Sequence, residues 1–435
     1  MPPDALPHED TCLRAVASSD PRYDGQLYVG VAQTGSYHCP SCPEACGELH
    51  FFAVAVAAQV AGFRACPRCR PDDSPGSPVW RARNDLAARA LRLIQNGEHD
   101  GVDLLADGLD CTPQEVTDAL TAAVGTGPEQ LLTAQRADTA RARAGSEGTT
   151  VVLQLPVRAP FDAAGLLAFL DAHLVAGVEE RVGTTYRRTL RLPHGPGVAA
   201  LTLSKDTVGC TLRLTDLRDL WPAVDRCRRM LDLDADPQAV AEALGRDPAL
   251  GEVVRSNPGL RLPGAADGTE VAVRTVVGQQ VSVAAARTVT ARIVRALGDP
   301  LAASDGGLTH VFPTAAAIAA GEDSVFAMPT SRRQAVRTIC AALADGGVTL
   351  HPGADREATE RAMLALPGIG PWTASYLRLR ALGDPDVFLP TDLAVRKALT
   401  RLGISPGAAD DWRPWRSYAV LHLWTALGAF PAVPG

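Results

Sequence analysis

The chain has 435 residues, a formal net charge of −7, and 46% hydrophobic against 21% charged residues. This length predicts two to four domains, and the composition is typical of a globular protein. The longest apolar run, Phe51 to Phe63, is too short to cross a bilayer, and the first residues lack the pattern of a signal peptide. We therefore expect a cytoplasmic protein and exclude a membrane-embedded one.

The negative charge is concentrated in the first third of the chain. Residues 1–147 hold 12 Lys+Arg against 20 Asp+Glu, and residues 148–435 hold the remaining 30 and 29. A nearly neutral region can still bind DNA through a local basic face and backbone amides. The acidic first third argues against tight phosphate binding there.

Five of the ten cysteines fall in one short stretch near the N-terminus. Cys39-Pro-Ser-Cys42 and Cys66-Pro-Arg-Cys69 form two CxxC pairs that are separated by 23 residues. Two thiolate pairs at this spacing are typical of a tetrahedral Zn²⁺ site. The sequence therefore predicts a zinc-binding domain over residues 1–74, with these four cysteines as ligands.

The segments around these cysteines resemble the N-terminal zinc domain of Ada-type adaptive-response proteins. The resemblance lies in DTCLRAV (10–16), SSDPRYDG (18–25), QTGSYHCPSCP (33–43) and FFAVAVAAQVAGFRACPRCRPD (51–72). In that family a zinc-bound thiolate accepts a methyl group from an alkylated phosphotriester, because zinc keeps the sulfur deprotonated and nucleophilic. The resemblance implies a bound Zn²⁺ ion.

The first CxxC pair departs from the family at the residue that matters most. His38 stands where the family has its methyl-accepting cysteine, and Cys39 stands where it has an arginine. Two ligand sets stay open: Cys39 binds in a tighter loop, or His38 completes a Cys₃His site. Cys46 is a spare thiol that could replace Cys39. Because an imidazole accepts no methyl group in this way, we expect a structural zinc module with weakened or lost phosphotriester repair.

The next region, residues 79–145, is helical by its apolar spacing and turn residues. It resembles the AraC-type helix-turn-helix that follows the zinc domain in Ada-type proteins. The segment at the position of the recognition helix, EVTDALTAAV (115–124), has no Arg, Lys, Asn or Gln with which to contact base edges or phosphates. We therefore expect a degenerate helix-turn-helix without specific operator binding.

A third region, residues 150–219, changes to short alternating or apolar segments typical of strands. One helix, FDAAGLLAFLDAHLV (161–175), lies between the first two of them; the strand-like segments are VVLQLPV, TYRRTLRLP, VAALTLSK and CTLRLTD. This pattern predicts a small α+β unit. From Leu220 to residue 435 the sequence predicts amphipathic helices throughout.

The sharpest motif is LALPGIGPWTASYLRLRALGDPDVFLPTDLAVRKAL, residues 364–399. Gly368 and Gly370 permit a tight hairpin whose amides, at the start of the following helix, can hold a DNA phosphate without reading its sequence. Asp392 opens a further helix, so its carboxylate can face the substrate nucleotide beside that clamp. The motif predicts a DNA-binding hairpin and a catalytic carboxylate.

This segment resembles the helix-hairpin-helix superfamily of DNA glycosylases, and most closely the 3-methyladenine DNA glycosylase II (AlkA) type. The resemblance continues in GLRLPG (259–264), VRTVVGQQVSVAAAR (273–287) and RPWRSYAVLHLWTALG (413–428). It implies a multidomain, mainly α protein: a small zinc-bound α/β module, a helical helix-turn-helix segment, an α+β TBP-like subdomain, and an all-α helix-hairpin-helix glycosylase domain over residues 220–435.

The resemblance also assigns site residues. Asp392 takes the position of the catalytic aspartate, and Gln280 that of a leucine that wedges into the duplex. The aromatic substrate pocket is assigned to Trp372, Tyr376, Trp424 and Phe169. An alkylated base carries positive charge, which electron-rich rings favour, and it must first be flipped out of the duplex. The family further implies a monovalent cation at the hairpin.

The lysine content predicts the type of reaction. The chain has two lysines, Lys205 and Lys397, and Trp372 stands where bifunctional relatives have a lysine nucleophile. We expect a monomeric, monofunctional enzyme that acts on double-stranded DNA containing alkylated bases, uses no nucleotide cofactor and has no AP-lyase activity. The alternatives are an adaptive-response transcription regulator with a methyl-accepting zinc cysteine and a non-catalytic binder of damaged DNA.

Overall fold

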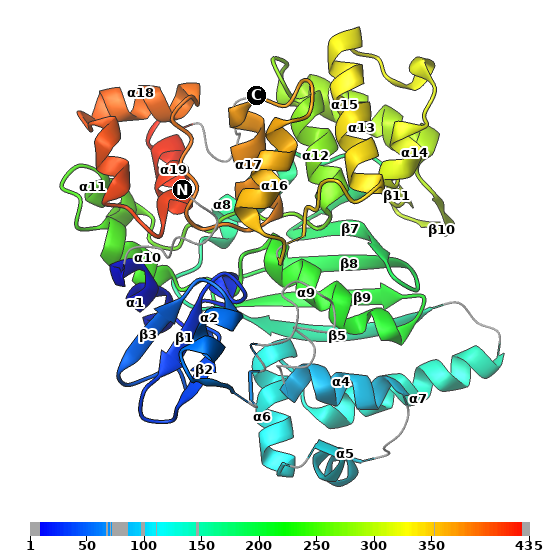
Figure 1. Ribbon diagram of the computed structural model, residues 1–435. Helices are drawn as coiled ribbons and strands as arrows, with labels where there is room; N and C mark the ends of the chain where they lie inside the picture. The colour runs from blue at the N-terminus through cyan, green and yellow to red at the C-terminus, as the bar shows by residue number, and fades with distance from the viewer. Residues whose placement is uncertain are drawn as a thin grey trace.

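The computed structural model describes residues 9–66, 68–69, 71, 86–96, 101–109, 111–144, 148–351 and 353–428. A central antiparallel sheet separates two parts of the molecule (Figure 1). The N-terminal module and helices α4–α7 lie on one side of it, and most of the C-terminal helices lie on the other. No helix in the described part of the chain is both long and apolar enough to span a membrane.

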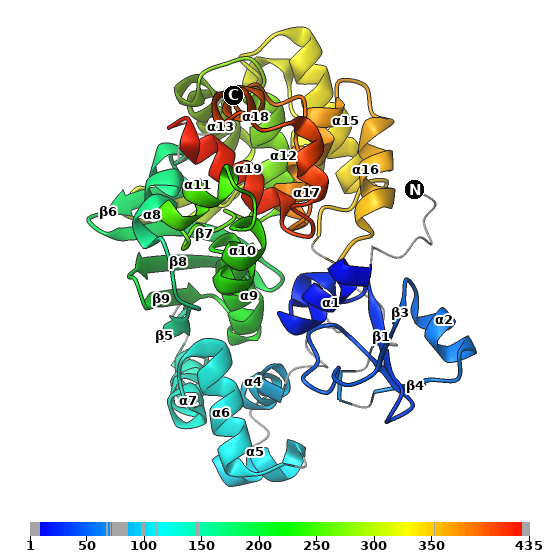
Figure 2. The ribbon, with the colours of Figure 1, turned by 90° about the vertical axis from the view of Figure 1, so that its left-hand side faces the viewer.

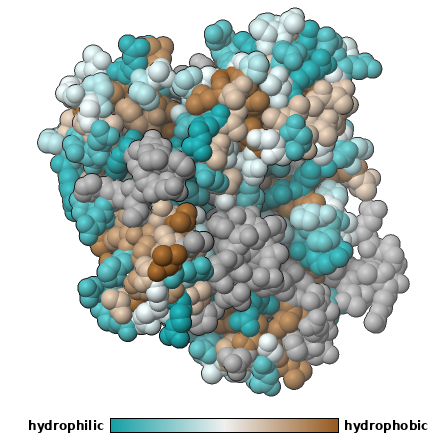
Figure 3. Space-filling view, in the orientation of Figure 1, coloured by the Kyte–Doolittle hydropathy of each residue, from teal (hydrophilic) through white to brown (hydrophobic). Residues whose placement is uncertain are grey.

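The N-terminal module is a four-stranded sheet with two short helices. Its strands are ordered β3-β1-β2-β4, with β2 and β4 parallel and the other pairs antiparallel. The elements are α1 (Glu9–Ala17), β1 (Tyr28–Val31), β2 (Ser36–His38), β3 (Leu49–Phe52), α2 (Ala55–Val60) and β4 (Arg64–Ala65). Hydrophobic residues gather over α2 on the outer surface, where Val60 is 84% exposed (Figure 3).

The described residues that follow form α4 (Leu86–Asn96), α5 (Val102–Leu109), α6 (Pro113–Val124) and α7 (Pro128–Ala144). Thr112 and Glu115 form a capping box at the start of α6. Gly125 ends that helix with φ +72°, and a Cβ there would lie 1.4 Å from the carbonyl oxygen of Gln154. This close approach seats the helices against the first strand of the central sheet, β5 (Thr149–Pro156).

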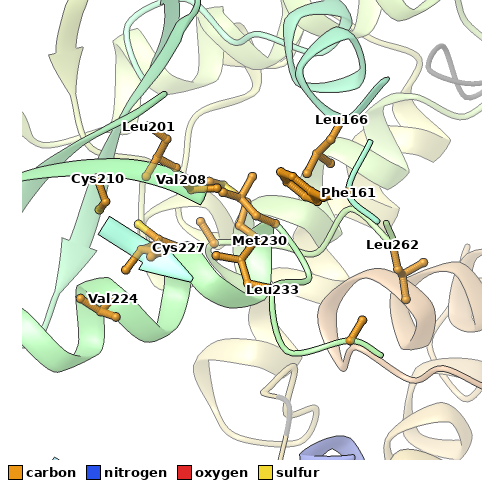
Figure 4. Close-up of a cluster of buried hydrophobic side chains, with 14 of the residues drawn as sticks. Phe161, Leu166, Leu201, Val208, Cys210, Val224, Cys227, Met230, Leu233 and Leu262 are labelled. Atoms are coloured by element: carbon orange, nitrogen blue, oxygen red, sulfur yellow. The ribbon is translucent and has the colours of Figure 1, made fainter. Parts of the chain in front are cut away.

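The central sheet has five antiparallel strands in the order β5-β9-β8-β7-β6, as expected for the α+β unit. The other strands are β6 (Glu179–Val182), β7 (Thr185–Leu192), β8 (Gly195–Leu203) and β9 (Thr207–Leu214), and α8 (Ala163–Ala172) connects β5 to β6. Strand β6 was not among the segments predicted from sequence. The next helix, α9 (Leu220–Met230), packs on the sheet, with Val224 and Cys227 facing Leu201 and Cys210 (Figure 4).

The C-terminal region is helical apart from one short hairpin that the sequence did not predict, β10 (Pro300–Asp305) and β11 (Leu308–His310). Its helices are α10 (Pro237–Leu244), α11 (Leu250–Ser256), α12 (Gly268–Val277), α13 (Val283–Leu297), α14 (Ala315–Ala319), α15 (Thr330–Ala344), α16 (Arg356–Leu364), α17 (Pro371–Ala381), α18 (Leu393–Leu402) and α19 (Arg416–Ala426). Helices α18 and α19 share one buried core with the sheet, whereas α12 and α15 belong to a second core. Helix α17 contributes to both cores and therefore spans the boundary on which the candidate site lies.

Candidate active site and zinc centre

Asp392 is the N-cap residue of α18. Its backbone is extended (φ −66°, ψ 129°), and its Oδ1 accepts a hydrogen bond from the Val395 amide at 2.8 Å. The helix N-terminus offers unpaired N–H groups and a partial positive charge, so a carboxylate is stable there. The residue is only 5% exposed, so its carboxylate depends on hydrogen-bond donors from the protein rather than on water.

Two indoles complete the surroundings of Asp392. Trp424 of α19 donates its Nε1–H to Oδ1 at 3.0 Å, and Trp372 of α17 donates to Oδ2 at 2.9 Å. Oδ1 therefore accepts two hydrogen bonds and Oδ2 accepts one from the described residues. A carboxylate oxygen can accept two, so Oδ2 keeps capacity for a further donor such as a water molecule. Residues from three helices thus fix the orientation of one carboxylate.

The aromatic residues of the site form two stacked pairs. Trp372 stacks on Tyr376 with ring centroids 4.9 Å apart and planes 11° from parallel, and Phe169 of α8 stacks on His173 at 4.4 Å. Both pairs line one cavity between α8, α12, α13 and α17. A base cannot enter between rings already in contact, so it would stack on an outer face. Trp424 is fully buried behind Asp392 and does not line this cavity.

Two cavity residues were missed at the sequence level. His173 donates from Nδ1 to the Phe169 carbonyl at 2.7 Å if that nitrogen carries its proton. Burial first, and nearby arginines in addition, lower the pKa of His173 to about 4 against the opposing effect of the hydrogen bond to the Phe169 carbonyl. Arg380 places its guanidinium 4.9 Å from the Phe169 ring centroid and donates to the Tyr376 hydroxyl at 2.7 Å. Both residues lie four positions after a predicted pocket aromatic, and this helical spacing was the available signal.

One wall of the cavity contains a buried network of charges between the sheet and α12. Arg188 pairs with Glu270 at 2.5 Å, and Arg274 pairs with Glu179 at 3.0 Å and with Glu270 at 2.7 Å. Burial alone would raise the pKa of Glu179, but Arg274 and Arg188 lower it below its usual value. The wall is therefore ionic and internally paired, which fixes the sheet to the helical region beside the cavity.

The hairpin between α16 and α17 presents its two glycines on either side of a buried residue. Gly368 and Gly370 are exposed, whereas Ile369 is 5% exposed. Gly368 has φ +87°, and a Cβ there would lie 2.6 Å from the Cβ of Ala335. Gly370 has φ −92° and is the N-cap of α17. The hairpin is thus anchored at Ile369 while its backbone stays accessible at both glycines.

Gln280 lies in the turn between α12 and α13. It is exposed and has φ +57°. The adjacent Gln279 donates from Nε2 to the Thr373 hydroxyl of α17 at 3.0 Å. This bond holds the turn beside the first residues of the helix that follows the hairpin, so Gln280 projects from the same region as the predicted clamp.

In the N-terminal module, strand pairing decides which residues meet. Parallel strands β2 and β4 pair Tyr37 with Ala65. The next residues along the chain, His38 and Cys66, therefore leave the sheet side by side. The structure brings His38 together with three cysteines: the ligand atoms of His38, Cys42, Cys66 and Cys69 all lie within 4.8 Å of one another, and all four residues are buried.

The chemistry of this cluster fits Zn²⁺. The distance from His38 Nδ1 to Cys42 Sγ is 3.4 Å, close to the roughly 3.5 Å between two ligands of a tetrahedral zinc ion. His38 Nε2 is buried without a hydrogen-bond partner among the described residues. The neighbouring Cys69 thiol and burial raise the pKa of Cys42, so a nearby cation is needed to keep these thiols ionised.

Cys39, one of the four cysteines predicted as ligands, is outside this group of four. Its backbone amide instead donates to Cys69 Sγ at 3.4 Å. Cys46 is exposed and is also outside the group. Of the two ligand sets that the sequence left open, the geometry favours Cys₃His with His38.

A helix-hairpin-helix followed by a buried, helix-capping aspartate beside an aromatic cavity defines a base-excision DNA glycosylase, here joined to a zinc module. The AlkA N-terminal domain family matches residues 152–267, and the metal binding domain of Ada matches residues 11–72. These two matches cover the sheet with its flanking helices and the N-terminal module.

Curated relatives extend these matches over the whole chain. A probable bifunctional transcriptional activator/DNA repair enzyme AlkA of Mycobacterium tuberculosis is 43% identical, covering 97% of each chain. DNA-3-methyladenine glycosylase 2 of Escherichia coli is 36% identical, covering 62% of this chain and 96% of its own length. The 3-methyladenine DNA-glycosylase from Archaeoglobus fulgidus has the same fold over 62% of this chain and 96% of its own, with a TM-score of 0.53 and 19% identity.

The chain belongs to the Ada/AlkA family, in which an Ada-type zinc domain precedes an AlkA-type glycosylase. It is an enzyme of the DNA-3-methyladenine glycosylase II type that acts in base excision repair, and it has zinc in its Ada domain.

Proposed function

We propose that the protein hydrolyses the N-glycosidic bond of positively charged, alkylated purines such as 3-methyladenine in double-stranded DNA, with Asp392 as its catalytic carboxylate. The observation that carries this proposal is the environment of Asp392. Two indole N–H groups and one backbone amide hold the carboxylate, yet Oδ2 keeps one unused acceptor direction. A charged group held this firmly can stabilise charge that develops during reaction.

Recognition begins with the DNA backbone and the flipped base. The exposed amides around Gly368 and Gly370 bind a phosphate, and Gln280 fills the space that the flipped nucleotide leaves. The base stacks against the aromatic pairs that contain Trp372 and Phe169. Its positive charge is favoured by the ring faces, and His173 is neutral at ordinary pH because burial lowers its pKa to about 4. We expect the protein to act as a monomer; the monovalent cation at the hairpin stays a prediction.

The chemical step releases the base and adds water to the sugar. The N-glycosidic bond breaks, its electron pair leaves with the base, and positive charge develops on the sugar. Asp392 stabilises that charge, and its free Oδ2 direction can orient the attacking water. Lys397 is exposed on α18, beyond Asp392 in the chain. With Trp372 at the position of the nucleophilic lysine, no covalent imine and no strand cleavage are expected.

The test compares two aspartates that share the same local chemistry. Asp247 also accepts from backbone amides at a helix start and from an indole, Trp412, at 2.9 Å. Its donor Trp412 does not line the cavity, whereas Trp372, which donates to Asp392, does. Release of 3-methyladenine from methylated DNA should fall at least about a hundredfold in Asp392→Asn and by less than about twofold in Asp247→Asn. Equal losses would mean that Asp392 acts only as a helix cap.

For the N-terminal module we propose a structural zinc site without methyl transfer. His38, Cys42, Cys66 and Cys69 would hold the metal, which supplies charge neutralisation and cross-linking of β2 and β4. Cys39 is 1% exposed and outside this group, so it is poorly placed to accept a methyl group. Mass spectrometry after incubation with methylated DNA should show no gain of a methyl group on any cysteine; methylated Cys39 would refute this.

Operator binding by the helix-turn-helix is not expected. The buried side of α6 packs in the core shared with the sheet through Val116 and Leu120. Its exposed side includes Glu115 and Asp118, which would repel DNA phosphates. A gel-shift titration with promoter DNA should therefore give the same affinity as with random duplex.

A further inference from the structure

The zinc module is attached to the glycosylase by more than its linker. Its η1 turn (Pro21–Tyr23) carries Arg22, whose side chain is only 11% exposed because it enters the surface of the C-terminal region. Helix α1 of the module lies beneath α16 and α17 in Figure 2. The partners of Arg22 show what this contact does.

Arg22 inserts into a buried cluster on the glycosylase side. Its Nη1 donates to the Tyr418 hydroxyl at 2.6 Å and lies 3.4 Å from Asp232 Oδ1. Its guanidinium also lies over the rings of Trp415 and Tyr418, 5.6 and 5.4 Å from their centroids. The Tyr418 hydroxyl in turn donates to Asp232 Oδ2 at 2.5 Å. Arg22 is also paired with Asp20 of its own module at 2.7 Å. It therefore bridges a carboxylate of the zinc module and the buried Asp232 of the glycosylase.

Further contacts surround this cluster. Arg14 donates to the carbonyl of Arg413 at 2.7 Å, and the Tyr23 hydroxyl donates to the carbonyl of Pro414 at 3.3 Å. In the opposite direction, Arg356 of α16 donates to the carbonyl of Arg22 and lies over the Tyr23 ring. Contacts made from both sides, including charged donors to carbonyls, are typical of a fixed interface rather than of a flexible tether.

The same contact connects the zinc centre to the active site. Two residues after Arg22, Asp24 accepts hydrogen bonds from the Ser41 amide at 3.0 Å and the Ser41 hydroxyl at 2.5 Å, and Ser41 directly precedes the zinc-site residue Cys42. On the other side, Tyr418 lies on α19, the helix whose Trp424 donates to Asp392. The hydrogen bonds of Asp24 and Arg22, two short stretches of backbone and one helix therefore join the two sites.

We propose that the zinc module is a zinc-dependent brace of the glycosylase, in which Arg22 clamps the metal-stabilised η1 turn onto α19 and so holds the helix that positions Asp392. Without metal, the loop around Ser41 loses its cross-links and the η1 turn loses its support. The buried Asp232 then loses the arginine that lies 3.4 Å from its Oδ1, which is unfavourable for a buried carboxylate. Burial already raises the pKa of Asp232 against the opposing effect of Arg22. The proposal does not depend on which base is released.

The test is a two-by-two comparison on the full chain: wild type and Arg22→Ala, each with zinc and after chelation. Hydrogen exchange of α19 amides is the main readout, with bound zinc measured in parallel. In wild type, chelation should accelerate α19 exchange about tenfold or more. In zinc-loaded Arg22→Ala, exchange should already be accelerated to a similar extent, zinc should stay bound, and chelation should add less than about twofold.

Arg218→Ala is the matched control. Arg218 bonds Asp216 two positions earlier, as Arg22 bonds Asp20, but it is 58% exposed and belongs to the glycosylase surface. It should leave α19 exchange unchanged. Tyr418→Phe removes only the shared hydroxyl and tests the clamp from the other side, should Arg22→Ala fold poorly; it should reproduce part of the acceleration.

Two results would overturn the brace. If chelation leaves α19 exchange unchanged in wild type, the module is an independent domain. If chelation accelerates α19 exchange equally in wild type and Arg22→Ala, Arg22 does not couple the zinc site to α19. Because exchange and zinc content are measured without substrate, either result is separable from a failure of base release in the Asp392 experiment.

Discussion

The carboxylate of Asp392 and the zinc cluster of the N-terminal module are both points where distant parts of the chain converge, but they are satisfied in different ways. At Asp392 the chain supplies three N–H donors to one carboxylate. In the zinc cluster it supplies three buried cysteines and His38, whose Nε2 has no hydrogen-bond partner in the described structure. At the first site protein groups alone hold the carboxylate and leave one acceptor direction of Oδ2 open, whereas the second site needs a cation to be stable.

The largest effect that follows from this contrast is the loss of zinc. His38→Ala and Cys42→Ser should each abolish stoichiometric zinc binding, because one of four ligands and on the order of 10 kcal/mol of metal-dependent stability are at stake. Cys39→Ala should keep one zinc per chain. Metal analysis after dialysis, with thermal unfolding of the N-terminal module, measures both.

The outcome at Cys39 distinguishes the two ligand sets. If Cys39→Ala loses its zinc while His38→Ala keeps it, the metal is bound by four thiolates, and the environment of His38 needs another explanation. The contrast with Asp392 would survive in that case, because a cation would still be required.

This ambiguity shows where sequence reasoning stops. The CxxC spacing predicted zinc, but the choice between His38 and Cys39 depends on the pairing of Tyr37 with Ala65, which no local pattern encodes. In the glycosylase, by contrast, the hairpin glycines and Asp392 lie in one continuous segment. Helical periodicity and glycine chemistry predicted the helix start after Gly370 and the helix start at Asp392, and α17 and α18 begin there.

Contacts between distant residues were equally invisible. Trp424 was expected in the substrate pocket, but it packs behind Asp392, and no residue of α19 is among those that line the cavity. The clamp of Arg22 on Asp232 and Tyr418 joins residues from three regions of the chain, and no spacing rule connects them. The individual roles of Trp372, Tyr376 and Phe169 stay predictions.

A second prediction concerns His173 in the cavity wall, and the expected effect on stability is smaller. The folded protein lowers the pKa of His173 from 6.5 to about 4, chiefly through burial. The unfolded chain therefore takes up a proton first as the pH falls. The contribution of neutral His173 to the free energy of unfolding is fully present above about pH 6.5. It is lost as the pH falls from about 6.5 to 4, by up to about 3 kcal/mol.

His173→Gln removes this titration and keeps a side-chain donor for the Phe169 carbonyl. Denaturant unfolding at a series of pH values should show a shallower loss of stability in the variant than in wild type over that window. Identical slopes would mean that His173 is not neutral in the cavity wall. Other histidines titrate in both proteins, so the difference between the two curves isolates His173.

The smallest predicted effect tests whether the donors around Asp392 act in catalysis or only in packing. Trp424→Phe removes the N–H to Oδ1 and keeps most of the buried ring, so the rate constant for base release should fall about tenfold, a typical effect for one charge-assisted hydrogen bond. KM should change little, because Trp424 does not line the cavity. Trp372→Phe, which alters both the cavity wall and Oδ2, should change KM as well.

Trp412→Phe is the matched control, since the Trp412 indole also donates to the carboxylate of an aspartate at a helix start, Asp247, at 2.9 Å. All three variants should lose comparable stability, because each leaves a partly or fully buried carboxylate with one donor fewer. Only the two at Asp392 should lose rate. If Trp412→Phe slows base release as much as Trp424→Phe, the indoles act through the stability of the helical core. The N–H donors to Asp392 would then stabilise the folded protein and not the transition state of base release.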